Sequence, residues 1–455
     1  MLTQELTNHR RAARARAFAR AQSTSSQLEA LNAQVASLQQ TVLTLQAEVD
    51  ALREDLTAVQ SNNVQALDPF VSVDPNPEIG VAGPHIIFSG VNIHIVSGSG
   101  ATNDGGAPTP LGLGNLIIGY DEDPAQAGSP LNPGDRGGSH NLVIGARHRF
   151  TEAAFGGLVA GEGNTISNAA ASVSGGQDNT ASGTFASVSG GQNNTASGTF
   201  ASVGGGQGNA AEGEAARVSG GSTNTASGPF ASVSGGQSNT AGGEAASVSG
   251  GTNNKAGKLF SSVSGGQGNT AGGTFASVSG GRGNTAGGEA ASVSGGLRNN
   301  ASGGNASVSG GKNNTAAGGE PFSEFATSVS GGNGNTASGD GASVSGGQSN
   351  TAGGNFASVS GGIGNAASGL FASVSGGSTN TASRPEASVS GGFRNIASGH
   401  DASVTGGHNN TADGSFASVS GGQGNTAGGD SSVVIGGVNI TDNNANSIAP
   451  KAPFP

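Results

Sequence analysis

The sequence predicts a mainly β protein, in which a parallel β-roll (β-solenoid) of 15-residue repeats follows an N-terminal α-helical coiled coil. Two observations carry this prediction. A phrase that reads ASVSGGQNNTASGTF in its plainest repeat (Ala186–Phe200) recurs from Ala171 to Asn425, and an apolar heptad pattern occupies residues 28–59. A fixed period of this length is typical of architectures in which each repeat covers the next.

Composition alone would suggest a disordered chain, because only 33% of the 455 residues are hydrophobic and 86 are Gly. The strict period argues against disorder, since a disordered chain has no reason to keep its apolar residues in phase. No Cys is present, which excludes disulfides and thiolate chemistry. The net charge of −11 argues against nucleic acid as the main partner.

Changes in composition along the chain indicate five parts. The first is basic, the second has the heptad pattern, the third is rich in Pro and Gly with short apolar runs, the fourth is the repeat array, and the last is a short tail. Their boundaries are 1–22 for the basic segment, 23–62 for the coiled-coil stalk, 63–155 for an irregular β adaptor with inserted loops, 156–440 for the β-roll array and 441–455 for the C-terminal tail.

The basic segment contains Arg10, Arg11, Arg14, Arg16 and Arg20. Two interpretations stay open: a solvated helix end, or a docking segment for an acidic partner or an anionic membrane surface. The segment has no clear signal peptide, because a secretory signal needs an apolar core of about seven residues or more. No apolar run in the chain reaches the length of about eighteen residues that a membrane-spanning helix needs.

The stalk has apolar residues spaced alternately by three and by four, which is the seam of a coiled coil. Val at a positions with Leu at d positions favours two strands, so the coiled coil alone predicts an oligomer and leans towards a dimer. The seam consists of Leu31, Val35, Leu38, Val42, Leu45, Val49 and Leu52.

In the adaptor and directly after it, five short apolar runs are bounded by Gly or Asn and are typical of buried strands. We interpret all five as irregular coils of the same roll. They are HIIFSG (from His85), VNIHIVSG (from Val91), NLIIG (from Asn115), NLVIG (from Asn141) and GGLVAG (from Gly156).

We number each repeat from one to fifteen, starting at Ala186 in the plainest repeat. Across seventeen repeats, position three is always Val, five and six are Gly, nine is Asn and eleven is Ala, whereas seven and eight vary freely. Alternation along two short strands sends the Val and Ala inward. Gly forms the corners, and Asn satisfies backbone groups at a bend. The structural ladder includes Val173, Val188, Val203, Asn179, Asn194, Asn209, Ala181 and Ala196.

Position fifteen holds Phe in eight repeats but Glu, Asp, Asn, Ala or Gly in others, so it must lie on an outer face or edge. The interior of one coil is thin, and a roll this poor in apolar residues needs a further burial surface. We therefore expect this Phe row to contact sister subunits or another surface. It consists of Phe185, Phe200, Phe230, Phe260, Phe275, Phe356, Phe371 and Phe416.

SVSGG followed by NTASG resembles the YadA-like head repeats of trimeric autotransporter adhesins, whose phrase is S-V-A-I-G, a turn and A-x-A-x-G. The likeness is greatest in NLIIG, NLVIG and SVVIGG (from Ser432), and it covers roughly Leu116 to Gly437. It implies a left-handed parallel β-roll assembled as a trimer. Those adhesins end in a stalk and a membrane barrel, whereas here the coiled coil is N-terminal, as expected of a fibre attached by its N-terminus.

We therefore expect a structural or adhesive surface fibre or tail-fibre-like protein. It would be extracellular, on a cell surface or a particle, and a homotrimer, although the coiled coil alone also allows a dimer. Its variable turns would contact a surface, receptor or glycan. The alternative is an ice- or carbohydrate-binding solenoid, because Thr occupies position ten in twelve of the seventeen repeats.

An enzyme is the weakest interpretation. The seven His are scattered without metal-ligand spacing, no carboxylate pair recurs, and no Gly-rich phrase carries the Lys of a phosphate-binding loop. We therefore predict no catalytic, cofactor-binding or metal-binding residue. The insertion 317–327 is expected to be a tolerated bulge, although Phe322 and Phe325 could touch a receptor.

Overall fold

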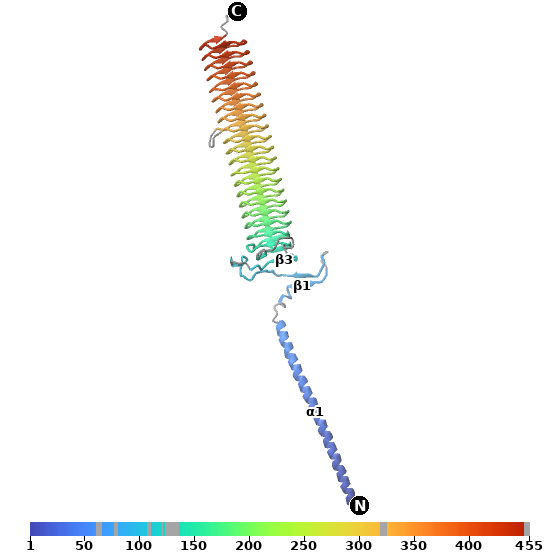
Figure 1. The fold of residues 1–455 in the computed structure, drawn as a ribbon. Coiled ribbons are helices and arrows are strands. Elements are labelled where there is room, and N and C mark those ends of the chain that lie inside the picture. The colour runs from blue at the N-terminus through green and yellow to red at the C-terminus, as the bar shows by residue number, and fades with distance from the viewer. Residues whose placement is uncertain are drawn as a thin grey trace. The chain divides into compact units, whose positions relative to one another are not determined.

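The computed structural model describes residues 1–60, 66–76, 81–106, 111–120, 122, 136–318 and 325–449. It divides into two compact units, Met1–His94 and Ile95–Pro455, which we describe separately (Figure 1). Phe322, most of the loop between Tyr120 and Gly138 and the last residues of the tail lie outside the described residues.

The first unit begins with one continuous helix, α1 (Leu2–Gln60), that includes both the basic segment and the stalk. The helix runs through the basic segment because that segment is rich in Ala and Arg and lacks Gly and Pro. No residue of α1 is buried. Within the described part of the chain, no helix combines the length and apolarity needed to cross a membrane.

Two of the five short apolar runs are not coils of the roll, so our interpretation of them was wrong. HIIF forms β2 (His85–Phe88), which pairs antiparallel with β1 (Val71–Asp74). A strand partner close in sequence costs less loop-closure entropy than a distant one, and VSVD supplies it. The run from Val91 to Gly98 forms no strand.

The second unit contains the roll. Three of the short runs do form parallel strands of its first sheet: β3 (Leu116–Ile118), β4 (Leu142–Ala146) and β6 (Leu158–Glu162), with Val143 in register between Ile117 and Val159. The short 3-10 helix η2 (Asp104–Gly106) precedes them. β4 and β6 are longer than the strands that follow, because they continue through Gly145 and Gly161, whereas each Ser-Val strand ends before its Gly pair.

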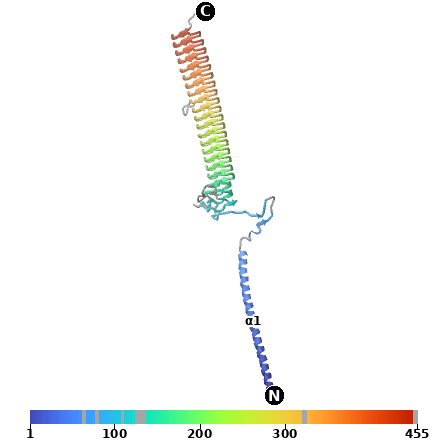
Figure 2. The same cartoon turned by 45° about the vertical axis from the view of Figure 1, so that its right-hand side comes forward.

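From there the chain forms about 20 coils of about fifteen residues, stacked one on the next (Figures 1 and 2). The first sheet continues from β8 (Ser172–Val173) and β10 (Ser187–Val188) to β40 (Ser418–Val419), always at positions two and three, and ends with β42 (Val433–Val434) and β44 (Ile448–Ala449).

The second sheet begins with β5 (Arg149–Phe150) and β7 (Thr165–Ile166). It continues from β9 (Thr180–Ala181) to β41 (Thr426–Ala427) at positions ten and eleven and ends with β43 (Thr441–Asp442). Every described pairing between coils in both sheets is parallel and in register, as Val188 with Val203 and Ala196 with Ala211 show.

Each coil also has a third side, which we did not predict. Position seven forms a single parallel bridge to the next coil, as in Gln177 to Gln192 and Gln192 to Gln207, and these bridges continue to Val438. A strand of one residue shows no alternation of apolar and polar residues, so pattern analysis cannot detect it.

Candidate functional site

The ladder residues all lie inside the roll. Val173, Val188, Ala181 and Ala196 are 0% exposed and Val203 is 1% exposed. Position one is a further interior position, because Ala186 and its equivalents are also fully buried. The interior is therefore filled by four small side chains from each repeat, Ala, Val, Asn and Ala, with Ser261 and Thr327 replacing the first Ala in two repeats.

The side chain of the Asn at position nine connects its own coil to the next one. In Asn194, the side-chain NH2 donates to the carbonyl oxygens of Gly190 (2.9 Å) and of Gly206 in the next coil (2.9 Å). Its Oδ1 accepts the backbone N–H of Asn209 at 2.9 Å. Because Asn194 is fully buried, these bonds satisfy groups that water does not reach.

The Asn residues at position nine form a row along the roll, which we call the Asn ladder. At both ends of this ladder a different residue takes position nine. His148 occupies position nine in an early coil, where it is fully buried, with Nε2 2.9 Å from Ile144 O and Nδ1 accepting the N–H of Asn164 at 3.3 Å. This geometry assigns the proton to Nε2, so the ring donates and accepts as Asn does. At the other end, Ile440 takes position nine, and Asp442 takes the place of the interior Ala.

The sequence analysis missed these end residues. Counting back from Asn164 through the longer early coils would have found His148. In the last coil, the Asp442 carboxylate accepts the Ser447 hydroxyl (2.5 Å) and the Asn444 N–H (3.1 Å). Atypical terminal repeats of this kind cap the end of a stacked array.

The two Gly of the first corner, at positions five and six, differ in whether a larger residue could replace them. Gly191 at position six has a φ of +86°, and a Cβ there would collide with the carbonyl oxygen of Gly206. Gly190 at position five has no such neighbour, because the nearest atom to an added Cβ is Gly175 C at 4.0 Å. Of these two Gly, only the one at position six is required within a single chain.

Our interpretation that positions seven and eight both vary freely was wrong for position eight, where the backbone conformation restricts the residue type. Position eight is left-handed, with φ of 56° at Asn193 and 55° at Asp178, and Gly208 and Gly268 have the same conformation. Gly, Asn and Asp tolerate this conformation best, and eleven of the seventeen repeats have one of them there. Position seven alone varies without this constraint.

The Phe row lies on the outside of the roll. Seven of its eight side chains are 52–61% exposed, and Phe356 is partly covered by Phe325. Neighbouring rings stack, with centroids 5.1 Å apart for Phe185 and Phe200 and for Phe356 and Phe371. Position fifteen is left-handed in every one of these Phe, with φ between 52° and 60°.

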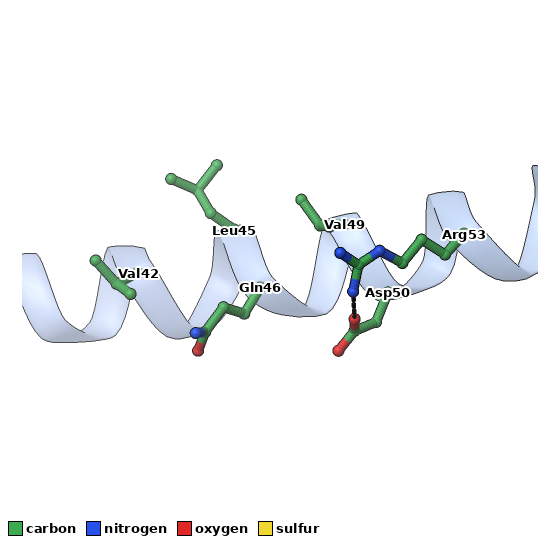
Figure 3. Close-up of a pocket in the computed structure, with 6 residues that line it drawn as sticks. All are labelled: Val42, Leu45, Gln46, Val49, Asp50 and Arg53. Atoms are coloured by element: carbon green, nitrogen blue, oxygen red, sulfur yellow. Dashed lines mark hydrogen bonds and ion pairs between the residues drawn. The ribbon is translucent and has the colours of Figure 1, made fainter.

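The seam of α1 lies open along its length. Leu31 is 55% exposed, Val35 45%, Leu38 64%, Leu45 53% and Leu52 66%. Figure 3 shows Leu45 and Val49 on the same side of the helix, next to the Arg53–Asp50 ion pair at 3.4 Å. The five Arg of the basic segment are also exposed.

A group of hydrogen bonds around Asp104, which we call the Asp104 clamp, fixes the segment that precedes the first coils. Asp104 is 5% exposed and accepts hydrogen bonds from Ser139 Oγ (2.5 Å), Ser97 Oγ (2.6 Å) and the N–H of Leu111 (2.9 Å). These bonds, that from Ser139 first, hold the pKa of the Asp104 carboxyl far below its usual range. Sequence analysis missed this clamp, because its members are far apart in the chain.

Two rows of hydroxyls flank the buried Val on the first sheet. Position two is Ser in sixteen of seventeen repeats, and position four is Ser or Thr in sixteen. Ser189 and its equivalents are exposed, and among the described residues of these two rows only Ser403 and Ser418 form a side-chain hydrogen bond with each other (3.2 Å). This pair of rows, which we did not predict, is more regular than the Thr row at position ten.

Among the features described above, those that could bind a partner are exposed surfaces. The residues that the structure describes contain no group of three or more His, Cys, Asp or Glu able to hold a metal ion. The fold and these surfaces define a β-solenoid repeat protein with an N-terminal helix. Comparison of the chain with models of known protein families and with curated proteins finds no match.

Proposed function

We propose that the chain is the subunit of a structural, adhesive fibre: a left-handed β-roll rod carried on a coiled-coil stalk, assembled as a homotrimer of the kind seen in YadA-like heads. The fibre would lie outside the cell, on a cell surface or on a particle such as an injection device. The seam of α1 is the observation that carries this proposal.

The seam supports self-association because the apolar residues keep their heptad spacing over about four heptads and remain about half exposed in one chain. An isolated helix without a packed face is marginally stable in water. Sister helices are the partners that match a heptad seam along its whole length, since each brings the same pattern in the same register. The stacked coils then extend the assembly as a rod.

The mass of the full-length protein in solution tests the proposal. Light scattering should give a multiple of the chain mass of 43.3 kDa, and three chains are expected. A monomer at micromolar concentration would rule out the fibre. Electron microscopy of the native source with antibodies against the roll should then show rods projecting from a surface.

The paired hydroxyl rows favour a second candidate, a solenoid that binds ice or a carbohydrate surface. Their hydroxyls repeat about every 4.8 Å along the roll, the spacing between parallel strands. Such a regular polar lattice suits a periodic ligand better than a single small molecule. Thermal hysteresis of purified protein, and co-sedimentation with insoluble polysaccharides, test this candidate, and the absence of both would exclude it.

A further inference from the structure

One edge of the roll combines aromatic rings with carboxylates. We call the side chains at positions fourteen and fifteen the aromatic–acidic edge. Sixteen of the seventeen repeats have both positions described. Eight of these have Phe at fifteen, seven have Glu or Asp at fourteen or fifteen, none has both, and the remaining repeat has Gly304 and Asn305.

Charge is segregated on this edge. None of the eight Lys and Arg residues of the array lies at either position, although they occur at several other exposed positions. The acidic residues there include Glu214, Glu244 and Glu289, all exposed. Among the described residues these three form no ion pair. The edge is thus an acidic stripe without Lys or Arg, and its single His, His400, contacts Asp401 of the same edge at 2.7 Å.

The Phe rings lie beside the carboxylates rather than apart from them. Along the roll, the coils of Glu214, Phe230, Glu244 and Phe260 follow one another, and the N–H of Phe230 donates to Glu214 O at 2.7 Å. Phe at a left-handed φ costs about 1 kcal/mol compared with Gly. Repeats with Ala, Asn or Gly show that the coil does not need Phe there, and rings that stack on a neighbour, such as Phe185 and Phe200, stay more than half exposed.

Arginine is the side chain that matches both groups. A guanidinium bonds a carboxylate through two parallel N–H groups and also stacks on an aromatic face within about 6 Å. The described residues of the roll include one such stacking contact on an aromatic face, where the Arg394 guanidinium lies 4.8 Å from the centroid of the Phe393 ring. Lysine offers a point charge without the planar fork.

The chain carries a segment of the required chemistry. Residues 1–22 contain five Arg, no Lys and one Glu, and these Arg are exposed and form no ion pair within the described residues. Its positive charge complements the edge, whereas residues 23–455 are strongly acidic overall.

We propose that the aromatic–acidic edge binds the arginine segment, residues 1–22, of a second chain. The proposal rests on the proposed fibre in one respect, that chains associate, and it adds a contact between assemblies that is distinct from the seam. Because the segment and the edge are different surfaces, the contact is heterologous and joins assemblies into open-ended bundles. It is also electrostatic, so salt must weaken it.

The experiment titrates full-length protein into a labelled peptide of residues 1–27 and follows fluorescence anisotropy at low salt. The edge variant carries Glu214→Gln, Glu244→Gln and Glu289→Gln, and should weaken binding about tenfold. The control variant carries Asp178→Asn, Glu212→Gln and Asp413→Asn, which remove the same charge elsewhere on the roll, and should stay within about twofold of the parent protein.

Two further sets of measurements test whether the guanidinium groups, the Phe rings and electrostatic attraction contribute to binding. A peptide with Lys in place of every Arg, and a protein with Phe230→Leu and Phe260→Leu, should each bind about threefold more weakly. About 0.5 M NaCl should abolish binding and disperse bundles in sedimentation, yet leave the mass of the seam-bound oligomer unchanged.

Equal weakening by the edge and control variants would overturn the proposal, because binding would then follow net charge alone. No binding at low salt would overturn it as well. Either result leaves the fibre standing if the oligomer mass persists, whereas a monomer that binds the peptide would refute the fibre and retain the edge.

Discussion

Helix α1 and the β-roll place their apolar side chains in opposite environments. In the roll, Val188 and its equivalents are 0–1% exposed, and the Asn ladder satisfies the backbone groups of each corner within one chain. In α1 no residue is buried, and Leu38 and Leu52 are 64% and 66% exposed. The roll is closed by its own neighbouring coils, whereas no described residue of the chain buries the apolar side chains of the helix.

A repeat can be covered along the chain, as in the roll, or between chains, as we propose for α1. A 15-residue period brings each coil onto the next, so every interior side chain except those of the end coils finds a copy of itself above and below. A seven-residue period in a single helix brings the apolar residues to one side but supplies nothing to cover them.

The largest effect is expected from charges in the seam. Val42→Lys with Val49→Lys buries like charges between sister helices, so the oligomer should dissociate to monomers, as measured by light scattering. Gln40→Lys with Ala47→Lys adds the same charge on the opposite side of the helix and should leave the mass unchanged. Retention of the oligomer by the seam variant would place the contact elsewhere.

Loss of one ladder Asn is expected to have the next largest effect. Asn269→Ala leaves Gly265 O and the N–H of Asn284 without partners, and Gly281 O keeps only the N–H of Gln267. At about 1–3 kcal/mol for each of these two unsatisfied groups, local stability should fall by about 2–6 kcal/mol. Hydrogen exchange in the adjacent coils measures the loss, and Gln267→Ala on the exposed third side serves as the control.

The two corner Gly provide a matched pair. Gly191→Ala forces a left-handed φ on Ala and a collision with Gly206 O, so it should destabilise the roll by about 2 kcal/mol in urea unfolding. Gly190→Ala, one residue earlier, places its methyl group in open space and should change stability by less than about 0.5 kcal/mol. Equal losses would show that position five is covered in the assembly.

The smallest effect is expected at the Asp104 clamp, and it depends on pH. Because folding lowers the pKa of this carboxyl, its contribution is present above the ordinary value of 3.8 and is lost as the pH falls below it. Asp104→Asn should therefore speed exchange of the Leu111 amide at pH 7 and remove the acid-dependent change near pH 3. An unaltered Leu111 amide would show that the loop is held by other contacts.

Much of the regular array follows from the sequence, because Val188 and Ala196 lie on alternating strands of constant length. HIIF was assigned to the wrong partner, since an apolar run does not reveal whether VSVD or another coil will pair with it. The left-handed φ of Asn193 and Phe200, the single-residue bridge at Gln192 and the His148 substitution depend on backbone geometry that residue spacing does not encode.

Some of the candidate functional features could be predicted from the sequence and others could not. The heptad seam and the external Phe row were predicted, because spacing and the acceptance of Glu386 or Asp401 at position fifteen are visible in the letters. The Asp104 clamp was not, because Ser97, Asp104 and Ser139 meet only through the fold.

Hydrogen–deuterium exchange on the seam variant and the parent protein tests the central claim most directly. If the roll is complete in one chain, amides of residues 172–434 should be equally protected in the oligomer and in the dissociated variant, while amides of α1 should lose protection on dissociation. Loss of protection in the roll together with the helix would contradict the claim, because the thin interior would then need sister subunits to stay closed.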